Sequence, residues 1–436
     1  IYTRPNSNKG KYKFHVANYF YVELDLYNSL ISMKVLIITQ YYFPENFKSN
    51  ELSFELQKRG YDVTVLTGLP NYPEGKIYEG YGWFKRRTET IHGVKVIRSL
   101  LLPRGKGSGL RLFLNYYSFA LFASWKAFLL GFREKYDAVI VHEPSPITQF
   151  YPALLLHKLH KTPVYYWVMD LWPESLEIAG GIKNKLVLNY FKNLATKFYR
   201  NSEKILITSK GFRESILEKG DFDEKIEYFP NWAENSIAEG RTDYPIPDLP
   251  DGFKVMFAGN IGESQDMETI MEAARLLGNR PEIKLIIVGE GRKLDFVKKF
   301  VKEHTLAESV HIMGRYPVEA MTTFFSKADV MLASLKAEKI FQYTVPAKVQ
   351  AYMSVGKPII GMLDGEGAEI INEANCGVSV PAGSAEKLSK AIVTLSVLDR
   401  QELRKQGENG RNYFLQHFQL SSCISNLERI INKKDL

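Results

Sequence analysis

Two glycines follow an apolar run in the second half of the chain, in Phe257-Ala258-Gly259-Asn260-Ile261-Gly262. A glycine after a strand lets the backbone approach a ligand closely, and the positive end of a following helix favours an anion. Gly259 and Gly262 are therefore candidate contacts for a diphosphate, although they lack the Gly-x-Gly-x-x-Gly spacing of a dinucleotide-binding loop. Asn260 and Gln265 in the same loop are uncharged, so this loop alone cannot balance a diphosphate.

A candidate cation stands later in the chain, in Pro346-Ala347-Lys348. Lys348 falls just inside the start of an expected helix, where its ammonium group could meet a diphosphate. The alternative is an ordinary solvated surface lysine. Preorganised N–H donors, lysines and a helix end can together stabilise a leaving diphosphate.

A histidine and an aspartate end two apolar runs in the first half of the chain. His142 lies in Val141-His142-Glu143-Pro144, and Asp170 follows Met169. Histidine is suited to orient or exchange a proton near neutral pH. Asp170 could accept a hydrogen bond from an acceptor hydroxyl, or it could cap the next helix. His142 has a purely structural alternative as well.

Short apolar runs alternate with helical stretches from Met33 onward, which is typical of a parallel sheet covered on both faces. We expect two doubly wound, Rossmann-like α/β domains facing a cleft, with ligands beyond the carboxyl ends of the strands. The expected strands are Val35–Thr39, Val63–Thr67, Val94–Ser99, Ala138–His142, Val164–Met169 and Ile205–Ser209, then Val255–Ala258, Leu285–Val288, Val310–Met313, Val330–Ala333, Pro358–Met362 and Gly377–Val380.

The domain boundaries follow from breaks in this pattern. Residues 1–32, before Met33, are expected to be a leader or extension outside the fold and do not have the pattern of a secretory signal. Residues 33–230 form the N-terminal domain, and the proline-rich residues 231–252 form a linker. Residues 253–410 form the C-terminal domain. A C-terminal helix within 411–436 is expected to pack back on the N-terminal domain.

Composition narrows the partners. The net charge of +8 and the pI near 9.0 favour anionic partners. No nucleic-acid-binding motif accompanies the charge, so the sequence predicts no nucleic acid partner and leaves a phosphate-bearing substrate or an acidic membrane. Cys376 and Cys423 are far apart and lack metal-ligand spacing, which fits a reducing compartment.

An aromatic and aliphatic stretch covers Leu110–Gly131. Spanning a bilayer would bury Arg111 and Lys126, which is costly. Two alternatives remain: a helix lying on an anionic membrane surface, or a core helix. The first predicts a protein that binds peripherally to an anionic membrane. Basic residues flank the stretch at Arg104, Lys106, Arg133 and Lys135.

With these motifs the sequence resembles the GT-B glycosyltransferases of family 4, a retaining and metal-independent class, from Met33 to the C-terminus. Thr344–Ile360 resembles their nucleotide-sugar segment, which commonly carries two glutamates. Gln342 and Gln350 stand at those two positions, and the Arg and Lys common in the glycine loop are replaced by Asn260 and Gln265. Glu366 or Glu369 is a candidate for the missing ribose-binding carboxylate.

The same resemblance implies that the N-terminal domain, 33–230, binds the acceptor and that the C-terminal domain, 253–410, binds the nucleotide-sugar. It also assigns roles to single residues of the first half. It implies that His142 reaches the transferred sugar. It also implies that the loop Phe43–Asn50, through Asn46, Ser49 and Asn50, contacts a phosphate or a sugar hydroxyl. The alternative is an ordinary strand-to-helix turn with Ser49 or Asn50 as the N-cap.

The segments Gly68–Pro73 and Asp170–Glu174 look like those of an L-fucosaminyltransferase branch in bacterial surface polysaccharide synthesis. The resemblance implies transfer of N-acetyl-L-fucosamine or a related amino sugar from a UDP-sugar to a lipid-linked saccharide. Because such acceptors lie at the inner membrane, it also implies a cytoplasmic protein that is peripheral to that membrane. Retention is expected, in O-antigen or capsule synthesis, with no metal and no cofactor beyond the co-substrate. A nucleotide-sugar 2-epimerase of the same fold and a noncatalytic sugar- or lipid-binding subunit remain alternatives.

Overall fold

The structure is a computed structural model of the chain. It describes residues 32–106, 108–178, 181–233, 237, 240, 242–278 and 280–432. The expected leader, apart from Ser32, lies outside the described residues.

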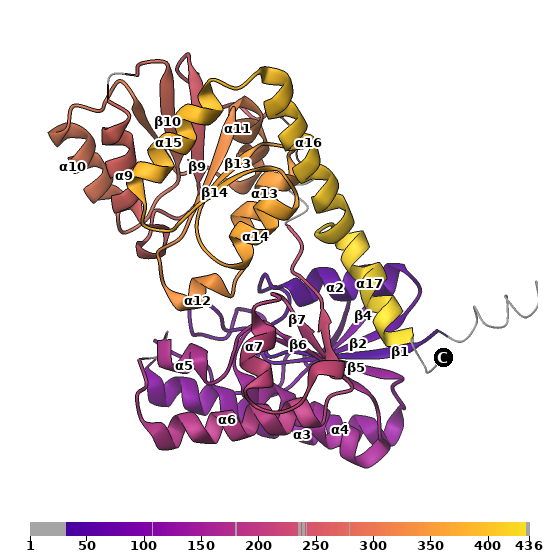
Figure 1. The fold of residues 1–436 in the computed structure, drawn as a ribbon. Helices are drawn as coiled ribbons and strands as arrows, with labels where there is room; N and C mark the ends of the chain where they lie inside the picture. The colour runs from indigo at the N-terminus through magenta and orange to yellow at the C-terminus, as the bar shows by residue number, and fades with distance from the viewer. Residues whose placement is uncertain are drawn as a thin grey trace, which may run out of the picture. The chain divides into compact units, whose positions relative to one another are not determined.

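The first sheet runs in the order β3-β4-β2-β1-β5-β6-β7-β8 (Figure 1). Parallel pairing joins β1 to β2 and β5, β2 to β4, and β7 to β8, whereas β3 pairs antiparallel with β4. The strands are β1 Lys34–Ile38, β2 Asp62–Thr67, β3 Thr88–Ile91, β4 Val94–Arg98, β5 Ala138–Glu143, β6 Val164–Val168, β7 Lys204–Ile207 and β8 Ile226–Tyr228.

Helices of this part begin and end for local reasons. Asn184 caps α6 by accepting hydrogen bonds from the N–H groups of Leu186 and Val187, and α4 ends where Lys161 adopts a left-handed conformation. The helices are α2 Lys48–Lys58, α3 Gly109–Arg133, η1 Ile147–Phe150, α4 Tyr151–His160, α5 Glu174–Ile178, α6 Lys185–Arg200, α7 Phe212–Leu217 and η2 Asp223–Lys225.

The second sheet runs in the order β11-β10-β9-β12-β13-β14 and is parallel throughout its described pairings. Its strands are β9 Phe253–Ala258, β10 Ile283–Val288, β11 Val310–Gly314, β12 Val330–Ser334, β13 Ile359–Met362 and β14 Gly377–Val380. Its helices are η3 Glu263–Gln265, α9 Met267–Leu276, α10 Leu294–Glu303, η4 Val318–Ala320, α11 Met321–Lys327, α12 Lys339–Gln342, α13 Ala347–Ser354, α14 Glu366–Glu373, α15 Ala385–Ser396, α16 Arg400–His417 and α17 Leu420–Asn432.

The core of the second sheet lies on both of its faces. Val255 and Phe257 of β9 belong to one buried cluster, and the alternating residues Met256 and Ala258 belong to another. Successive side chains of a strand point to opposite faces, so helices must cover both faces to bury this continuous apolar run. The prediction of two doubly wound α/β domains is confirmed.

The expected strands all occur, but two further strands were not predicted. β3 is an edge strand with half-exposed, mostly polar residues, and β8 has only three residues. β3 pairs antiparallel with β4 at the edge of an otherwise parallel sheet, among the pairings described. Short polar edge strands carry little apolar periodicity, which is why the sequence pattern missed them.

By packing, the chain divides into two compact units, Ile1–Tyr165 and Tyr166–Leu436. The first sheet nevertheless continues through β8, and no strand occurs between β8 and β9 among the described residues. The predicted boundary at residue 230 follows the sheets and stays a prediction. Within the second unit, Asn426 of α17 donates a hydrogen bond to the carbonyl of Tyr228 in β8, at 3.1 Å.

Candidate functional site

The loop after β9 makes close backbone approaches that only glycine allows. Gly259 has φ +131°, and a Cβ there would lie 2.8 Å from Cε of Lys348. A Cβ on Gly289, after β10, would lie 1.9 Å from the carbonyl oxygen of Gly259. These glycines therefore bring two strand ends and the Lys348 side chain together.

A pocket of about 440 Å³ opens at these strand ends. Its polar lining includes Asn260, Glu290 and Arg315, and Arg315 lies 3.8 Å from Glu290. The remaining lining residues are Gly259, Val288, Gly289, Gly291, Tyr316 and Met321. The pocket thus combines glycine backbone with one arginine, Arg315, whose guanidinium lies beside the Glu290 carboxylate. Sequence reasoning missed Arg315 because nothing in its local pattern distinguishes it from other surface arginines.

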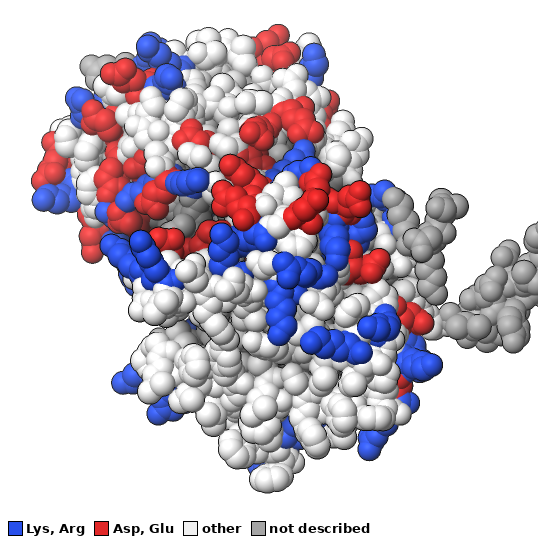
Figure 2. Space-filling model, turned by 60° about the horizontal axis from the view of Figure 1, so that its bottom comes forward, with Lys and Arg blue, Asp and Glu red and all other residues white. Residues whose placement is uncertain are grey.

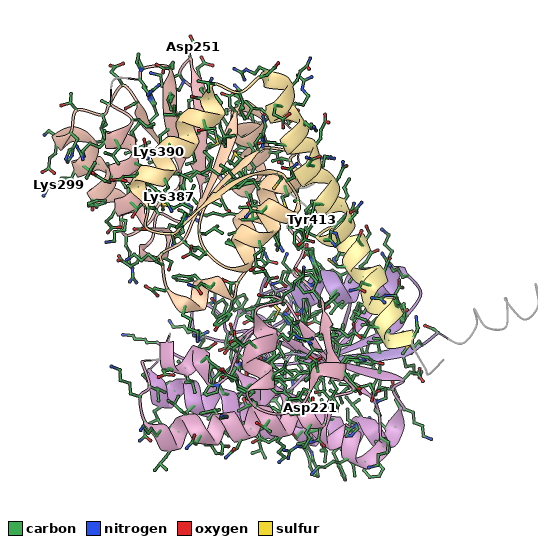
Figure 3. The ribbon with its side chains drawn as sticks, viewed as in Figure 1. Asp221, Asp251, Lys299, Lys387, Lys390 and Tyr413 are labelled. Atoms are coloured by element: carbon green, nitrogen blue, oxygen red, sulfur yellow. The ribbon has the colours of Figure 1, made fainter. Side chains whose placement is uncertain are left out.

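Lys348, in the first turn of α13, has an unusual environment. Its Nζ is shielded from solvent, lies 3.6 Å from the ring centroid of Phe257, and has no hydrogen-bond partner among the described residues. Burial lowers the pKa of this ammonium group to about 7. The alternative of a solvated surface lysine is therefore wrong. Figure 3 shows the usual placement for contrast, with Lys387 and Lys390 of α15 and Lys299 of α10 at the outer surface.

The three glutamines predicted to contact the donor, Gln265, Gln342 and Gln350, lie in different environments. Gln265 accepts a hydrogen bond from the N–H of Gly262 at 3.3 Å, so its side chain shapes the glycine loop. Gln350 is buried, and its Nε2 donates to the carbonyl of Asn231 at 2.7 Å. Gln342 is exposed at the end of α12. Of these three, only Gln342 leaves its side chain exposed to a ligand.

Glu366 and Glu369 were predicted as alternatives, and the structure places them very differently. Glu369 is exposed, whereas Glu366 is buried at the start of α14. Its Oε2 accepts hydrogen bonds from Ser209 Oγ and, at 3.0 Å, from the N–H of Gly211. Its Oε1 is shielded and has no hydrogen-bond partner among the described residues. Glu366 therefore holds a fixed carboxylate with one oxygen available.

His142 and Asp170 fall in different compact units. His142 is fully buried in β5, with Nδ1 3.3 Å from Thr39 Oγ1. Burial lowers the pKa of its imidazole to about 3, so the ring is neutral near pH 7. Asp170, after β6, lines a second pocket of about 270 Å³ together with Glu174 and Tyr343.

The three residues predicted in the loop after β1 are mostly turned to the loop itself. Asn50 accepts from the N–H of Phe43 and donates to the carbonyl of Glu45, and Ser49 donates to the carbonyl of Tyr41. Asn46 is exposed. The N-cap of α2 is Phe47, so the interpretation of Ser49 or Asn50 as the N-cap is wrong.

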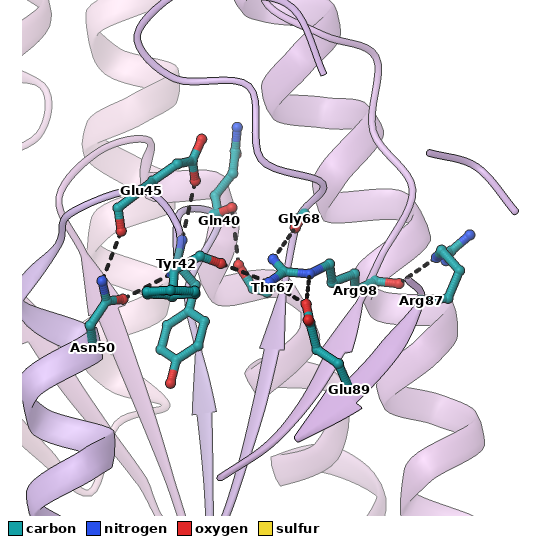
Figure 4. A network of polar contacts seen from close by, with 10 residues as sticks. Gln40, Tyr42, Glu45, Asn50, Thr67, Gly68, Arg87, Glu89 and Arg98 are labelled. Atoms are coloured by element: carbon teal, nitrogen blue, oxygen red, sulfur yellow. Dashed lines mark hydrogen bonds and ion pairs between the residues drawn. The ribbon is translucent and has the colours of Figure 1, made fainter. Parts of the chain in front are cut away.

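A buried charge network, missed in the sequence, supports the loops after β1 and β2 (Figure 4). Glu45 Oε1 accepts hydrogen bonds from the N–H groups of Asn71 and Tyr72, at 2.7 and 2.6 Å. Burial raises the pKa of Glu45 to about 7 despite these bonds. Arg98, with no exposed surface, donates to the carbonyls of Phe43 and Gly68 and pairs with Glu89 at 2.7 Å. An arginine ending an apolar strand was the available signal.

Helix α3 turns its large apolar side chains outward. Its buried face carries small residues, including Ala120, Ala123 and Ala127, and at Gly131 a Cβ would lie 2.7 Å from His160 of α4. Its exposed apolar residues are Leu110, Phe113, Leu114, Leu121, Phe122, Trp125, Leu129 and Phe132. No helix among the described residues is both long and apolar enough to cross a membrane.

Comparisons with known proteins agree with this architecture. Residues 49–232 match the family described as Glycosyl transferase 4-like domain, and residues 245–413 match Glycosyl transferases group 1. The chain is 28% identical to the probable glycosyltransferase WbjE of Pseudomonas aeruginosa over 58% of this chain and 66% of that protein. It is 27% identical to the putative colanic acid biosynthesis glycosyl transferase WcaI of Escherichia coli, over 74% and 82%.

Among solved structures, HepE of Anabaena in complex with UDP superposes with a TM-score of 0.63 and 14% identity, covering 92% of this chain and 99% of that one. At this identity the likeness concerns the fold. The chain thus has the two parallel-sheet α/β domains of the GT-B fold, and it matches a glycosyl transferase 4-like domain in its first half and glycosyl transferases group 1 in its second half.

Proposed function

We propose that this protein transfers a sugar from a UDP-sugar to a lipid-linked saccharide with retention of configuration, without a metal. The proposed process is O-antigen, capsule or related bacterial polysaccharide synthesis, in line with the similarity to WcaI, a putative colanic acid biosynthesis glycosyl transferase. N-acetyl-L-fucosamine or a related amino sugar is the proposed donor sugar, on the sequence resemblance described above. The match to group 1 glycosyl transferases over residues 245–413 supports a donor site in the second sheet.

One observation carries the donor proposal: the Nζ of Lys348 is buried beside Gly259 with no hydrogen-bond partner among the described residues. Burying a cation without an anion is costly, and the cost disappears when an anion arrives. A diphosphate against the amides of the glycine loop would supply that anion. HepE, which shares this fold, was solved with UDP.

In the proposed donor site, the positive charge that binds the diphosphate comes from residues outside the glycine loop. Asn260 lines the pocket proposed for the diphosphate. Gln265 accepts a hydrogen bond from the N–H of Gly262 and so helps to fix the conformation of the glycine loop. Lys348 and Arg315 would supply the positive charge as the leaving group develops negative charge. Glu366 Oε1 would accept a ribose hydroxyl in place of the missing glutamates, with exposed Gln342 as a neutral sugar contact.

His142 and Asp170 stay the proposed groups nearest the reaction. The lowered pKa of His142 means that its imidazole is neutral near pH 7. A neutral imidazole can orient a sugar hydroxyl through a hydrogen bond but is not a reservoir of protons. The proposal therefore gives His142 a positioning role at the sugar and Asp170 the role of acceptor for the incoming hydroxyl.

The outward apolar residues of α3 support peripheral binding to the cytoplasmic face of an anionic membrane. Figure 1 places α3 at the lower end of the view, and Figure 2, turned to bring that end forward, shows a broad surface there that is almost free of charged side chains. An exposed apolar stripe with basic residues at its ends fits a helix lying in a membrane interface. Flotation with phosphatidylglycerol vesicles tests this: recovery with the vesicles supports it, and recovery only in the free fraction contradicts it.

UDP release separates the proposed transferase from its two alternatives. Purified protein is incubated with a panel of UDP-sugars, with and without lipid-linked saccharides extracted from a polysaccharide-producing bacterium. Release that depends on acceptor supports transfer. Conversion of the UDP-sugar to its epimer without release would indicate a 2-epimerase, and UDP binding with neither outcome would indicate a noncatalytic subunit.

A further inference from the structure

Three aromatic side chains meet where β1 and β2 end, in the first compact unit. Tyr41 stacks on Phe47 with ring centroids 5.1 Å apart, and Tyr72 lies 5.6 Å from each of them. We call Tyr41, Phe47 and Tyr72 the aromatic cluster. Tyr72 is 40% exposed, so the cluster presents a ring to solvent. Glu45 fixes this ring, since its carboxylate accepts the N–H of Tyr72.

Arg104 lies against this cluster. Its guanidinium carbon is 4.9 Å from the centroid of the Tyr72 ring, and its backbone N–H donates to Asn71 Oδ1 at 3.2 Å. Among the described residues the guanidinium has no carboxylate partner. The nearby Glu45 already accepts hydrogen bonds from backbone N–H groups on both of its oxygens. Arg104 is half-buried, and its guanidinium donates no hydrogen bond to any residue that the structure describes, so its donors can bind an anion.

The segment that carries Arg104 leads directly into the apolar face of α3. Two hydrogen bonds hold the backbone of Leu102 against that helix. Its N–H donates to Ser118 Oγ, and its carbonyl accepts from Asn115 Nδ2. Leu110, Phe113 and Leu114 are 72%, 52% and 40% exposed at the start of the helix. Residues 90–133 contain no Asp or Glu, so no acidic group in this segment opposes an anion.

We infer that Arg104 and Tyr72 form the binding site for the phosphate group of the lipid-linked acceptor, whose hydrocarbon chain lies along the exposed apolar residues of α3. This rests on the proposed function, since it names the part of the acceptor that the protein holds. Arginine binds phosphate through a planar, two-pronged set of donors. The Tyr72 ring holds the guanidinium by a cation–π contact and leaves those donors at its edge.

The occupant follows from the combination of groups. A free phosphate or nucleotide would leave the apolar start of α3 exposed, and a neutral lipid would leave Arg104 without an anion. A lipid phosphate satisfies both at once. Lys106, exposed on the same segment, adds a second positive charge without a fixed partner in the part of the chain that the structure describes.

Calorimetric titration with farnesyl diphosphate tests the inference, with farnesol and inorganic diphosphate as its separate halves. Wild-type protein should bind farnesyl diphosphate at least tenfold more tightly than either half. Arg104→Met should lower that affinity at least tenfold and leave UDP binding unchanged. Arg86→Met is the matched control, because Arg86 also lies over a tyrosine ring, 5.4 Å from the centroid of Tyr81, at an exposed position of the same unit.

Each outcome decides the inference. Equal affinity of wild type and Arg104→Met for farnesyl diphosphate overturns it, as does a loss of the same size in Arg86→Met. A parallel loss of UDP affinity in Arg104→Met would assign Arg104 to the donor and also overturn it. Wild-type protein that does not bind UDP contradicts the proposed function, whereas UDP binding without discrimination between farnesyl diphosphate and its halves contradicts the acceptor site alone.

Discussion

Buried charged side chains around the loops after β1 and β2 differ in their hydrogen bonding from two on helices α13 and α14. Glu45 accepts hydrogen bonds from backbone N–H groups, and Arg98 donates to backbone carbonyls and pairs with Glu89. On α13 and α14, by contrast, Lys348 Nζ and Glu366 Oε1 are buried without hydrogen-bond partners among the described residues, although Glu366 Oε2 accepts two hydrogen bonds. Satisfied buried charges rigidify a structure, whereas unsatisfied ones are destabilising until a ligand pairs with them. The difference separates scaffold from candidate ligand contact.

The largest effect is expected at Arg98, whose removal should lower the free energy of unfolding by roughly 3–5 kcal/mol. Arg98→Met leaves Glu89 without its partner and two carbonyls without a donor, and breaking a buried pair in this way costs roughly 3–5 kcal/mol. Urea unfolding followed by circular dichroism measures the free energy of unfolding. Arg86→Met, on the surface, is the control and should change it by less than about 0.5 kcal/mol. Equal effects of the two substitutions would contradict the scaffold role.

Glu45 should make stability depend on pH. Its pKa is raised from 4.5 to about 7 by burial, so the folded state holds a proton that the unfolded chain has released between these values. Its contribution is therefore fully present below pH 4.5 and is lost as the pH rises through 7, by about 1–3 kcal/mol. Unfolding of wild type and Glu45→Gln at pH 5 and pH 8 gives this term by difference. A wild type that loses no more stability than Glu45→Gln would contradict it.

Lys348 should make UDP binding depend on pH. Lys348 has a pKa near 7 because burial disfavours its charged form, and a bound diphosphate would raise that pKa. Binding should then take up a proton above pH 7, and UDP affinity should fall up to about tenfold between pH 7 and pH 8, or about 1.4 kcal/mol. Lys348→Met serves as the control, because any pH dependence that remains in this variant comes from ionisation of UDP or of other groups and not from Lys348. The same pH slope in both proteins would exclude Lys348 as the titrating group.

The smallest effect is expected at Gln265, which shapes the glycine loop through one neutral hydrogen bond to Gly262. Gln265→Ala should weaken UDP binding by about 0.5–1.5 kcal/mol, the usual worth of such a bond. Gln342→Ala, at an exposed position, is the companion variant that reports on direct contact with the sugar. A loss in Gln265→Ala as large as that in Lys348→Met would mean that Gln265 touches the diphosphate directly.

The sequence predicted the fold well because buried parallel strands such as β1 and β9 are continuous apolar runs. Edge strand β3 escaped because its residues alternate and are mostly polar. The glycine loop and Lys348 were also anticipated, since glycine and helix-start positions leave local signals. The environment of each side chain was not: Glu366 and Glu369 are three residues apart on one helix, yet only packing decides that one is buried and the other exposed. Likewise, the engagement of Glu45 with Asn71 and Tyr72 depends on a contact between two loops distant in sequence.

Titration of UDP into wild type, Lys348→Met and Lys390→Met at pH 6.5 tests whether the unpartnered lysine marks the donor site. Wild type and Lys390→Met should bind equally, and Lys348→Met should bind at least tenfold more weakly, because a hydrogen bond to a charged group is worth about 1.5–3 kcal/mol. The free energy of unfolding of Lys348→Met should be unchanged or higher, since the substitution removes a buried cation that has no anionic or hydrogen-bond partner in the described part of the chain. Unchanged UDP affinity in a folded Lys348→Met protein would contradict the account.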